Sequence, residues 1–162
     1  MELFVIRHAI AVPGSMLLVD ADRPLSPKGR KRFSQAVLGL QCLKVRFDRL
    51  YHSPWRRAVE TAELLAPVLE SKAVCSPALA RAPSQDLLDA LVGARVALVG
   101  HEPWMGELVA WLTTGTLSDG SVFAFKRGGI AWLEGQPQPG RMVLQAFLPP
   151  KVLRELGEGI AR

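Results

Sequence analysis

The sequence contains few of the residues that build disulfide frameworks or metal sites. Only two cysteines and three histidines occur among its 162 residues. Cys42 and Cys75 lack C-x-x-C spacing, so neither a zinc site nor a disulfide is indicated, and we expect two small buried thiols. No carboxylates cluster with His8 or His101, and His52, which has no partner at ligand spacing, is interpreted as structural. We therefore expect no metal ion and no other cofactor.

Long apolar runs are also missing. No stretch approaches the roughly 18 consecutive apolar residues that a membrane-spanning helix requires. The first residues, MELFVIRH, contain no basic leader and are too short for a signal sequence. We therefore expect a cytoplasmic protein that does not bind membranes.

Acidic residues are fewer than basic ones, with 15 Asp and Glu against 20 Lys and Arg, which gives a net charge of +5. Such a charge is compatible with nucleic acid, anionic lipid or a phosphorylated partner. Basic residues cluster in RPLSPKGRKR (23–32) and WRR (55–57), but neither cluster carries interleaved aromatic residues for stacking bases. We expect no nucleic-acid partner, and a steep salt dependence of DNA binding would contradict this.

The length and the lack of repeats, linkers and low-complexity segments predict one domain over residues 1–162. Two continuous apolar runs, LFVI (3–6) and ARVALVG (94–100), are typical of parallel strands buried on both faces. VRFDRLYH (45–52) alternates as a half-buried strand does. The remaining predicted strands are AVCSPAL (73–79), SVFAF (121–125), GIAWLE (129–134) and MVLQAFL (142–148).

Helices are predicted between these strands from capping residues and apolar stripes. Ser26 as N-cap and Pro27 at the first position begin a helix that runs to about residue 43. Pro54 and Pro103 begin two more helices, each soon after a strand. Further helices are expected in SQDLLDALV (84–92) and near PPKVLRELG (149–157). Alternating helices and strands, followed by hairpin-like strands, predict a mixed sheet flanked by helices.

Basic side chains follow three of the predicted strands. The first strand runs into Arg7 and His8, the second into SPWRR (53–57), and the strand 94–100 into His101. In open α/β sheets, ligands bind beyond the carboxyl ends of parallel strands, so these groups are expected to meet there. The N-termini of the helices predicted after two of these junctions favour an anion. The pattern therefore indicates a site for a compact anion, above all phosphate.

Arginine and histidine supply complementary chemistry for phosphoryl transfer. A guanidinium group matches phosphate oxygens in pairs and keeps its charge. A neutral imidazole can attack phosphorus while a second, protonated imidazole steadies the oxygens. A single histidine at a strand end is more often a structural hydrogen-bonding group, so the hypothesis depends on the three junctions meeting. Trp55 and Trp104, at the starts of two predicted helices, are candidates for the pocket wall or for the core.

Four motifs resemble those of a known family. RHA (7–9), DADRPLSPKGRKRFSQA (20–36), SPWRRAVETA (53–62) and VGHEPWM (99–105) resemble the histidine phosphatase superfamily, also called the phosphoglycerate mutase-like or RHG family. The DRPLS stretch and the closing FLPPKVLREL (147–156) resemble the SixA-type phosphohistidine phosphatases. The resemblance implies a three-layer α/β/α sandwich with a mixed, mainly parallel sheet.

The resemblance also implies roles for individual residues. It makes His8 the nucleophile that becomes phosphorylated and Arg7 a phosphate-binding residue beside it. The catalytic arginine of the S-P-x-x-R-A-x-x-T pattern directly precedes alanine, which makes it Arg57 and leaves Arg56 as a surface neighbour. His101 matches the second histidine of the family's core.

Two further positions are assigned to substrate binding, and one departs from the family pattern. Arg23 resembles an additional phosphate-contacting arginine of SixA-type members, and Ser53 opens the S-P-x-x-R-A pattern. Ala9 stands where the R-H-G motif has glycine, a change that SixA-like members tolerate.

A second departure concerns the general acid. Mutase and sugar-phosphatase relatives carry a glutamate between the two later motifs, but AVCSPALARAPSQD (73–86) contains none. An alkoxide leaves poorly without a proton, whereas the imidazole of phosphohistidine needs less help. This favours protein phosphohistidine as substrate, although Asp22, Glu102 or Asp86 could supply an acid from another position.

The sequence therefore predicts a metal-independent phosphatase that works through a phosphohistidine intermediate and acts on protein phosphohistidine. The alternative is a phosphomonoesterase of a small phosphometabolite such as a sugar, nucleotide or cofactor phosphate. A non-catalytic phosphate-binding or scaffold module is a third hypothesis. The expected partner is a phosphorylated protein or a small phosphorylated substrate, and we expect a monomer.

Overall fold

A computed structural model describes residues 1–159, and within them six strands form one sheet in the order β3-β2-β4-β1-β5-β6. Strands β1 to β4 run parallel to one another, and β5 runs antiparallel to both of its neighbours. The sheet is therefore mixed and mainly parallel, as predicted. The strands are β1 (Glu2–Arg7), β2 (Arg49–His52), β3 (Val74–Cys75), β4 (Arg95–Gly100), β5 (Ile130–Gly135) and β6 (Met142–Leu148).

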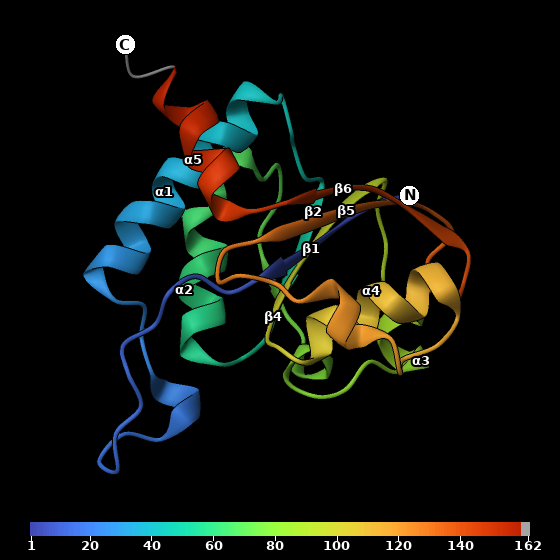
Figure 1. The fold of residues 1–162 in the computed structure, drawn as a ribbon, viewed down its shortest axis with the longest axis horizontal. Helices are drawn as coiled ribbons and strands as arrows, with labels where there is room; N and C mark the ends of the chain where they lie inside the picture. The colour runs from blue at the N-terminus through green and yellow to red at the C-terminus, as the bar shows by residue number, and fades with distance from the viewer. Residues whose placement is uncertain (160–162) are drawn as a thin grey trace.

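Helices cover both faces of this sheet (Figure 1). Helices α1, α2 and α5 lie on one face, and α3 and α4 lie on the other, which confirms the three-layer α/β/α sandwich. No helix within residues 1–159 is long and apolar enough to cross a membrane. The helices are α1 (Pro27–Cys42), α2 (Arg56–Leu64), α3 (Gln85–Asp89), α4 (Trp104–Thr114) and α5 (Pro150–Glu158); the 3-10 turns are η1 (Asp20–Asp22), η2 (Ala66–Val68), η3 (Pro77–Ala80) and η4 (Gly120–Phe123).

Strand β1 lies at the centre of the core because side chains on both of its faces are apolar. Phe4 and Ile6 pack toward α1 and α2, while Leu3 and Val5 pack toward α4, as the alternation of a strand requires. Burying each of these side chains contributes about 1.5–3 kcal/mol. β1 is thereby held between β4 and β5, and the position where its polar end emerges is fixed.

Helix α1 begins as predicted and packs closely on α5. The Ser26 hydroxyl accepts a hydrogen bond of 3.0 Å from the Gly29 N–H, and Pro27 is the first helical residue. A Cβ on Gly39 would lie 2.0 Å from the carbonyl oxygen of Leu153, so only glycine permits this approach of the two helices. The close contact holds α5 at the end of the sheet where β1 finishes.

The segment 121–125 does not form the predicted strand. Most of it belongs to η4, which packs on α4: a Cβ on Gly120 would lie 2.8 Å from the backbone nitrogen of Glu107. The Phe125 N–H donates a hydrogen bond of 2.7 Å to the Glu102 carboxylate. The contacts with α4 and with Glu102 therefore take the place of pairing with a strand.

The other predicted elements are present, with shorter bounds in several cases. β2 begins at Arg49 because Phe47, within the predicted strand, pairs with the chain around η2. The Phe47 N–H donates a hydrogen bond of 2.8 Å to the Val68 carbonyl oxygen, and the Phe47 carbonyl oxygen accepts one of 2.9 Å from the Glu70 N–H. Helix α2 begins at Arg56, two residues after the predicted Pro54. Helix α4 likewise begins one residue after the predicted proline.

The prediction of two buried thiols is wrong. Cys42 is the last residue of α1 and is half-buried, with its thiol 3.0 Å from the carbonyl oxygen of Leu156. Cys75 lies on the edge strand β3 and is exposed. Both cysteines are free. Neither is buried, because they lie at the margins of the fold instead of in its core.

Candidate active site

The ends of β1, β2 and β4 bring the predicted side chains together. These three strands are neighbours in the sheet, and the ladder extends past them: the His8 N–H donates to Gly100 O and the Ser53 N–H to Val99 O, both at 3.0 Å. The ring centroids of His8 and His101 lie 5.1 Å apart. Two histidines separated by more than ninety positions in the sequence thus face a common point, as the strand pattern predicted.

The hydrogen bonds of His8 fix its tautomer. Its Nδ1 lies 2.7 Å from the carbonyl oxygen of Ala9, and because a carbonyl only accepts, Nδ1 carries the proton. The other nitrogen, Nε2, then keeps its lone pair in the neutral ring. Nε of Arg57 donates to that lone pair at 3.2 Å. The ring is therefore held in the orientation and protonation state of a nucleophile.

Arg57 is a buried cation whose remaining nitrogens bind Asp20. Its side chain extends from the first turn of α2. Its Nη2 donates a hydrogen bond of 2.9 Å to the Asp20 carboxylate, and its Nη1 donates one to the Asp20 carbonyl oxygen. The ring of Trp55 lies under the guanidinium carbon at 4.6 Å, a cation–π contact. Arg23 lies 3.3 Å from the same carboxylate. Asp20, which the sequence analysis did not single out, thus neutralises two of the predicted phosphate-binding arginines.

His101 lies in an aromatic setting on the other side of the site. Its Nε2 shares a hydrogen bond of 2.7 Å with the hydroxyl of the fully buried Ser53. Its Nδ1 is buried and has no partner in the described part of the chain. The rings of Trp55 and Trp104 lie 4.4 Å and 6.2 Å from the His101 ring, so both tryptophans line the site.

Burial sets the protonation of both histidines. The pKa of His8 is lowered from 6.5 to about 3, mainly by burial and also by the positive charges nearby, against the bond to Ala9 that raises it. The pKa of His101 is also lowered to about 3, first by burial and then by Arg57. Both rings are neutral at neutral pH, which differs from the expected protonated second imidazole.

Burial also lowers the pKa of the two arginines, although counterions oppose it. For Arg57 the opposing group is Asp20, and for Arg7 it is Glu102. Because an arginine starts from a very high pKa, both remain charged at neutral pH.

The pKa of His8 predicts the acid limb of the activity profile. The nucleophilic form is present above the lowered pKa and is lost only as the pH falls towards about 3. We expect kcat/KM for p-nitrophenyl phosphate, corrected for ionisation of the substrate, to show no inflection at 6.5, the ordinary pKa of histidine. Below pH 6.5 the two histidines bind protons in the unfolded chain but not in the folded one, so the stability of the fold decreases as the pH falls. Rates must therefore be measured before the protein unfolds. An enzyme inflection at 6.5 would contradict a desolvated nucleophile.

Thr61 positions the loop that carries His8. Its hydroxyl donates a hydrogen bond of 2.6 Å to the carbonyl oxygen of Arg57, one helical turn earlier, and accepts a hydrogen bond of 3.0 Å from the Ala9 N–H. The same Ala9 residue accepts the bond from the His8 ring. The hydroxyl of the fully buried Thr61 therefore connects α2 to Ala9, the residue that bonds the His8 ring.

Replacing Thr61 by valine tests this connection. Thr61→Val leaves the Ala9 N–H unpaired, which costs about 1–3 kcal/mol of stability. We expect kcat to fall about tenfold or more while KM changes little, because the ring loses its orientation and not its substrate contacts. Thr61→Ser, which keeps the hydroxyl, restores kcat; a valine variant with the parent kcat would exclude the positioning role.

Arg7 and Arg56 occupy different surroundings. Arg7 is half-buried at the end of β1, donates to the Phe125 carbonyl oxygen through Nη1, and leaves a buried Nε without a partner in the described residues. Arg56 points away from the site and donates 3.0 Å to the Glu60 carboxylate. Its prediction as a surface neighbour agrees with its exposed side chain.

The three candidate acids also differ in position. Glu102 follows His101, and burial raises its pKa against the effect of the two N–H donors and Arg7. Asp22 is exposed, and Asp86 lies 3.8 Å from Arg81 on the exposed side of α3. Glu102 is therefore the only one of the three with a carboxyl beside a site residue in the part of the chain that the structure describes. Across residues 1–159, no three His, Cys, Asp or Glu side chains form a group that could hold a metal ion.

Comparison with known proteins agrees with this geometry. The model of the histidine phosphatase superfamily (branch 1) matches residues 3–81. An uncharacterized protein of Picosynechococcus sp. (strain ATCC 27264 / PCC 7002 / PR-6) is 33% identical over 141 residues, which cover 82% of this chain and 84% of that protein. The structure of the protein histidine phosphatase SixA complexed with tungstate gives a TM-score of 0.77 at 27% identity, covering 94% of this chain and 99% of that one. Phosphoserine phosphatase from Entamoeba histolytica in complex with 3-phosphoglyceric acid gives 0.70 at 18% identity, covering 94% and 98%, a likeness of fold alone.

These findings place the protein in the class of phosphatases. The chain belongs to the histidine phosphatase superfamily. Within it, the SixA type is the subgroup that the chain resembles in sequence and in fold.

Proposed function

We propose that the protein hydrolyses phosphohistidine on proteins, without a metal ion, through a phosphorylated His8. The observation that carries this proposal is the lone pair on His8 Nε2, which faces Arg57 while the other ring nitrogen donates to a carbonyl oxygen. Arg7, Arg57 and, less directly, Arg23 supply the positive charge that a transferring phosphoryl group requires.

In the first step, His8 Nε2 attacks phosphorus and forms a P–N bond. The bond from phosphorus to the substrate imidazole breaks, and its electron pair returns to the leaving nitrogen, which takes a proton from solvent. The phosphoryl oxygens replace the Asp20 carboxylate on Arg57. The added negative charge raises the pKa of His101, which then donates to an oxygen as the sequence analysis expected.

In the second step, water attacks the phosphorus of phospho-His8. The P–Nε2 bond breaks and its electron pair returns to the ring. Inorganic phosphate leaves with the oxygen and one proton of the water, and the other proton goes to solvent, replacing the one taken up in the first step. The carbonyl oxygen of Ala9 holds Nδ1 throughout, so the same tautomer is regenerated. The cycle requires no other group to carry the phosphoryl.

A phosphomonoesterase of a small metabolite is the second candidate, and Glu102 favours it. Its carboxyl is half-buried beside Arg7, and its raised pKa is a property of general acids. Such an acid would protonate the alkoxide that a monoester releases. Both Glu102 oxygens nevertheless accept backbone hydrogen bonds, at 2.7 Å from Phe125 and 3.3 Å from Gly106, which holds the carboxyl in a structural position.

Matched peptides distinguish the two candidates. We expect kcat/KM to be about 10²-fold or more higher for a phosphohistidine peptide than for the same peptide carrying phosphoserine or for any of a panel of phosphometabolites. This factor is the contribution that a general acid would make to the hydrolysis of a monoester. Chelator treatment leaves the rate unchanged. Glu102→Gln retains the phosphohistidine activity, with the thermal midpoint as the measure of folding.

The opposite pattern supports the second candidate. A metabolite hydrolysed faster than phosphohistidine, together with loss of that activity in Glu102→Gln, would show that Glu102 is the acid of a phosphomonoesterase. Tungstate, which is bound in the SixA structure, serves as an inhibitor probe, and we expect it to compete with either substrate.

A further inference from the structure

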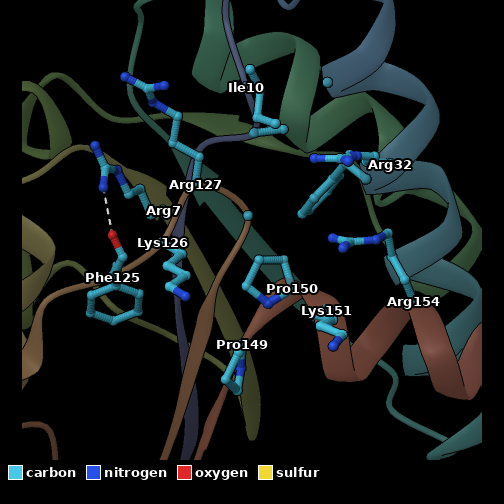
Figure 2. A pocket seen from close by; sticks show the side chains of 14 residues that line it. Arg7, Ile10, Arg32, Phe125, Lys126, Arg127, Pro149, Pro150, Lys151 and Arg154 are labelled. Carbon is cyan, nitrogen blue, oxygen red and sulfur yellow. Dashed lines mark hydrogen bonds between the residues drawn. The ribbon is translucent and has the colours of Figure 1, made fainter.

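A basic groove lies at the end of β1, between α1, α5 and the segment before β5 (Figure 2). Its volume is about 530 Å³. Of the fourteen described residues that line it, six are basic and none is acidic. These basic residues are Arg7, Arg32, Lys126, Arg127, Lys151 and Arg154.

The cations come from separate elements and line both sides of the groove. Arg32 of α1 and Arg154 of α5 lie on one side, and Lys126 and Arg127 lie on the other (Figure 2). Within residues 1–159, the one ion pair made by any of the six is between Lys151 and Glu155, at 3.6 Å. The groove therefore carries a positive field that neighbouring carboxylates compensate only in part, and several negative charges fit it.

The floor of the groove is apolar and joins the catalytic site. Pro149 and Pro150 lie between the two sets of cations (Figure 2), and Phe33 also lines the groove. Arg7 and Ala9, which flank His8 in sequence, also line it. A ligand in the groove would thus extend from the reacting group, with negative charges at the rim and carbon atoms on the floor.

A second surface lies on the other side of the site. Met16 and Leu17, in the loop before η1, are fully exposed, and Val19 is mostly exposed. In Figure 1 this loop and α5 lie on opposite sides of the end of β1. Neighbouring exposed apolar side chains are typical of surfaces that contact another macromolecule. The reacting group is therefore flanked by an apolar loop tip and a basic groove.

We infer that the basic groove binds an acidic polypeptide segment next to the phosphohistidine of a protein substrate. The inference rests on the proposed function and adds the chemistry of the substrate to it. Four of the six cations are exposed, and their long side chains stand apart around the groove instead of converging on one group. This spacing suits several carboxylates along a chain better than one compact phosphate, and the apolar floor accepts the carbon atoms between them.

Peptide binding tests the groove without turnover. Two fluorescein-labelled peptides carry the same central, unphosphorylated histidine, flanked by Asp and Glu in one and by Ser and Gln in the other. Fluorescence anisotropy gives the Kd for the parent and for R32E/R154E, whose folding is checked by circular dichroism and thermal midpoint. The control K72E/R141E makes the same change of net charge at exposed positions outside the groove.

We expect the parent to prefer the acidic peptide, and salt to weaken that preference. R32E/R154E raises the Kd of the acidic peptide by about tenfold or more, and the control leaves it near the parent value. Equal binding of both peptides, or a groove variant that binds as the parent does, would overturn the inference. Tighter binding of tripolyphosphate than of the acidic peptide would overturn it too, in favour of a small-anion site. The peptides carry no phosphoryl group, so the binding measurement does not depend on catalysis. A failure to hydrolyse phosphohistidine would refute the proposed function without changing the outcome of the binding measurement.

Discussion

His8→Ala is expected to lower kcat/KM by about 10⁴-fold or more on both p-nitrophenyl phosphate and a phosphohistidine peptide. The side chain supplies the only nitrogen lone pair that Arg57 contacts in the described site, so its removal leaves phosphorus without its nucleophile. Loss of the ring also removes two hydrogen bonds, one from Nδ1 to Ala9 and one from Arg57 to Nε2, and the fold is expected to survive this change. Steady-state rates and the thermal midpoint measure both effects.

His52 offers a matched control for the nucleophile. Its ring is also at a strand end and also bonds a neighbouring carbonyl oxygen, with Nδ1 2.9 Å from Ser53 O. It contacts no cation of the site in the described structure, and we expect His52→Ala to keep the parent rate within about threefold. A His8→Ala variant with substantial remaining turnover, or a His52→Ala variant that loses it, would assign the chemistry to a different ring.

Arg57→Ala is expected to reduce kcat by about 10²–10³-fold, because it removes a buried charge from the position where phosphoryl oxygens must gather. It also removes the donor that orients His8 Nε2. Arg57→Lys restores only part of the rate, since an ammonium group cannot contact His8 and two further acceptors in one plane.

Arg56→Ala provides the control for Arg57. The two arginines are adjacent in the same helical turn, but Arg56 is exposed and bonds Glu60 instead of the site. Glu60 keeps a second cation, Arg30 at 2.7 Å, so the loss of Arg56 has little effect on stability. If Arg56→Ala and Arg57→Ala lowered kcat equally, the assignment of the catalytic arginine from the R-A pattern would be wrong.

The sequence predicted the fold best where a single local signal was strong. Continuous apolar runs identify β1 and β4, because strands covered on both faces need no polar alternation. Ser26 and Pro27 identify the start of α1 by their own backbone preferences. The segment 121–125 has an apolar pattern too, but its partners are α4 and Glu102, and a periodicity cannot show which element supplies the hydrogen bonds.

The sequence predicted where the site lies better than it predicted the contacts and charges within the site. Parallel strands share one carboxyl edge, so the positions of His8, Ser53 and His101 followed from the strand pattern. The protonation of the rings did not follow from it. Their pKa values depend on burial, which arises from tryptophans and helices distant in the sequence.

Three features needed the structure itself. Asp20 stands three residues before Arg23, a spacing that signals an ion pair, but its contact with Arg57 bridges two distant segments. Thr61 follows the arginine by one helical turn, and its bond to the Ala9 N–H depends on the packing of α2 against β1. The basic groove combines α1, α5 and the segment before β5, and more than a hundred positions of the sequence separate Arg32 of α1 from Arg154 of α5.

The phosphoryl group on the enzyme is the most direct quantity to measure. Parent enzyme is mixed with a phosphohistidine substrate, quenched in base within the first turnovers, and digested for mass spectrometry. We expect one acid-labile phosphoryl group on His8, absent from His8→Ala. A phosphoryl group on another residue, or rapid turnover with no phosphoenzyme at any time, would contradict transfer through His8.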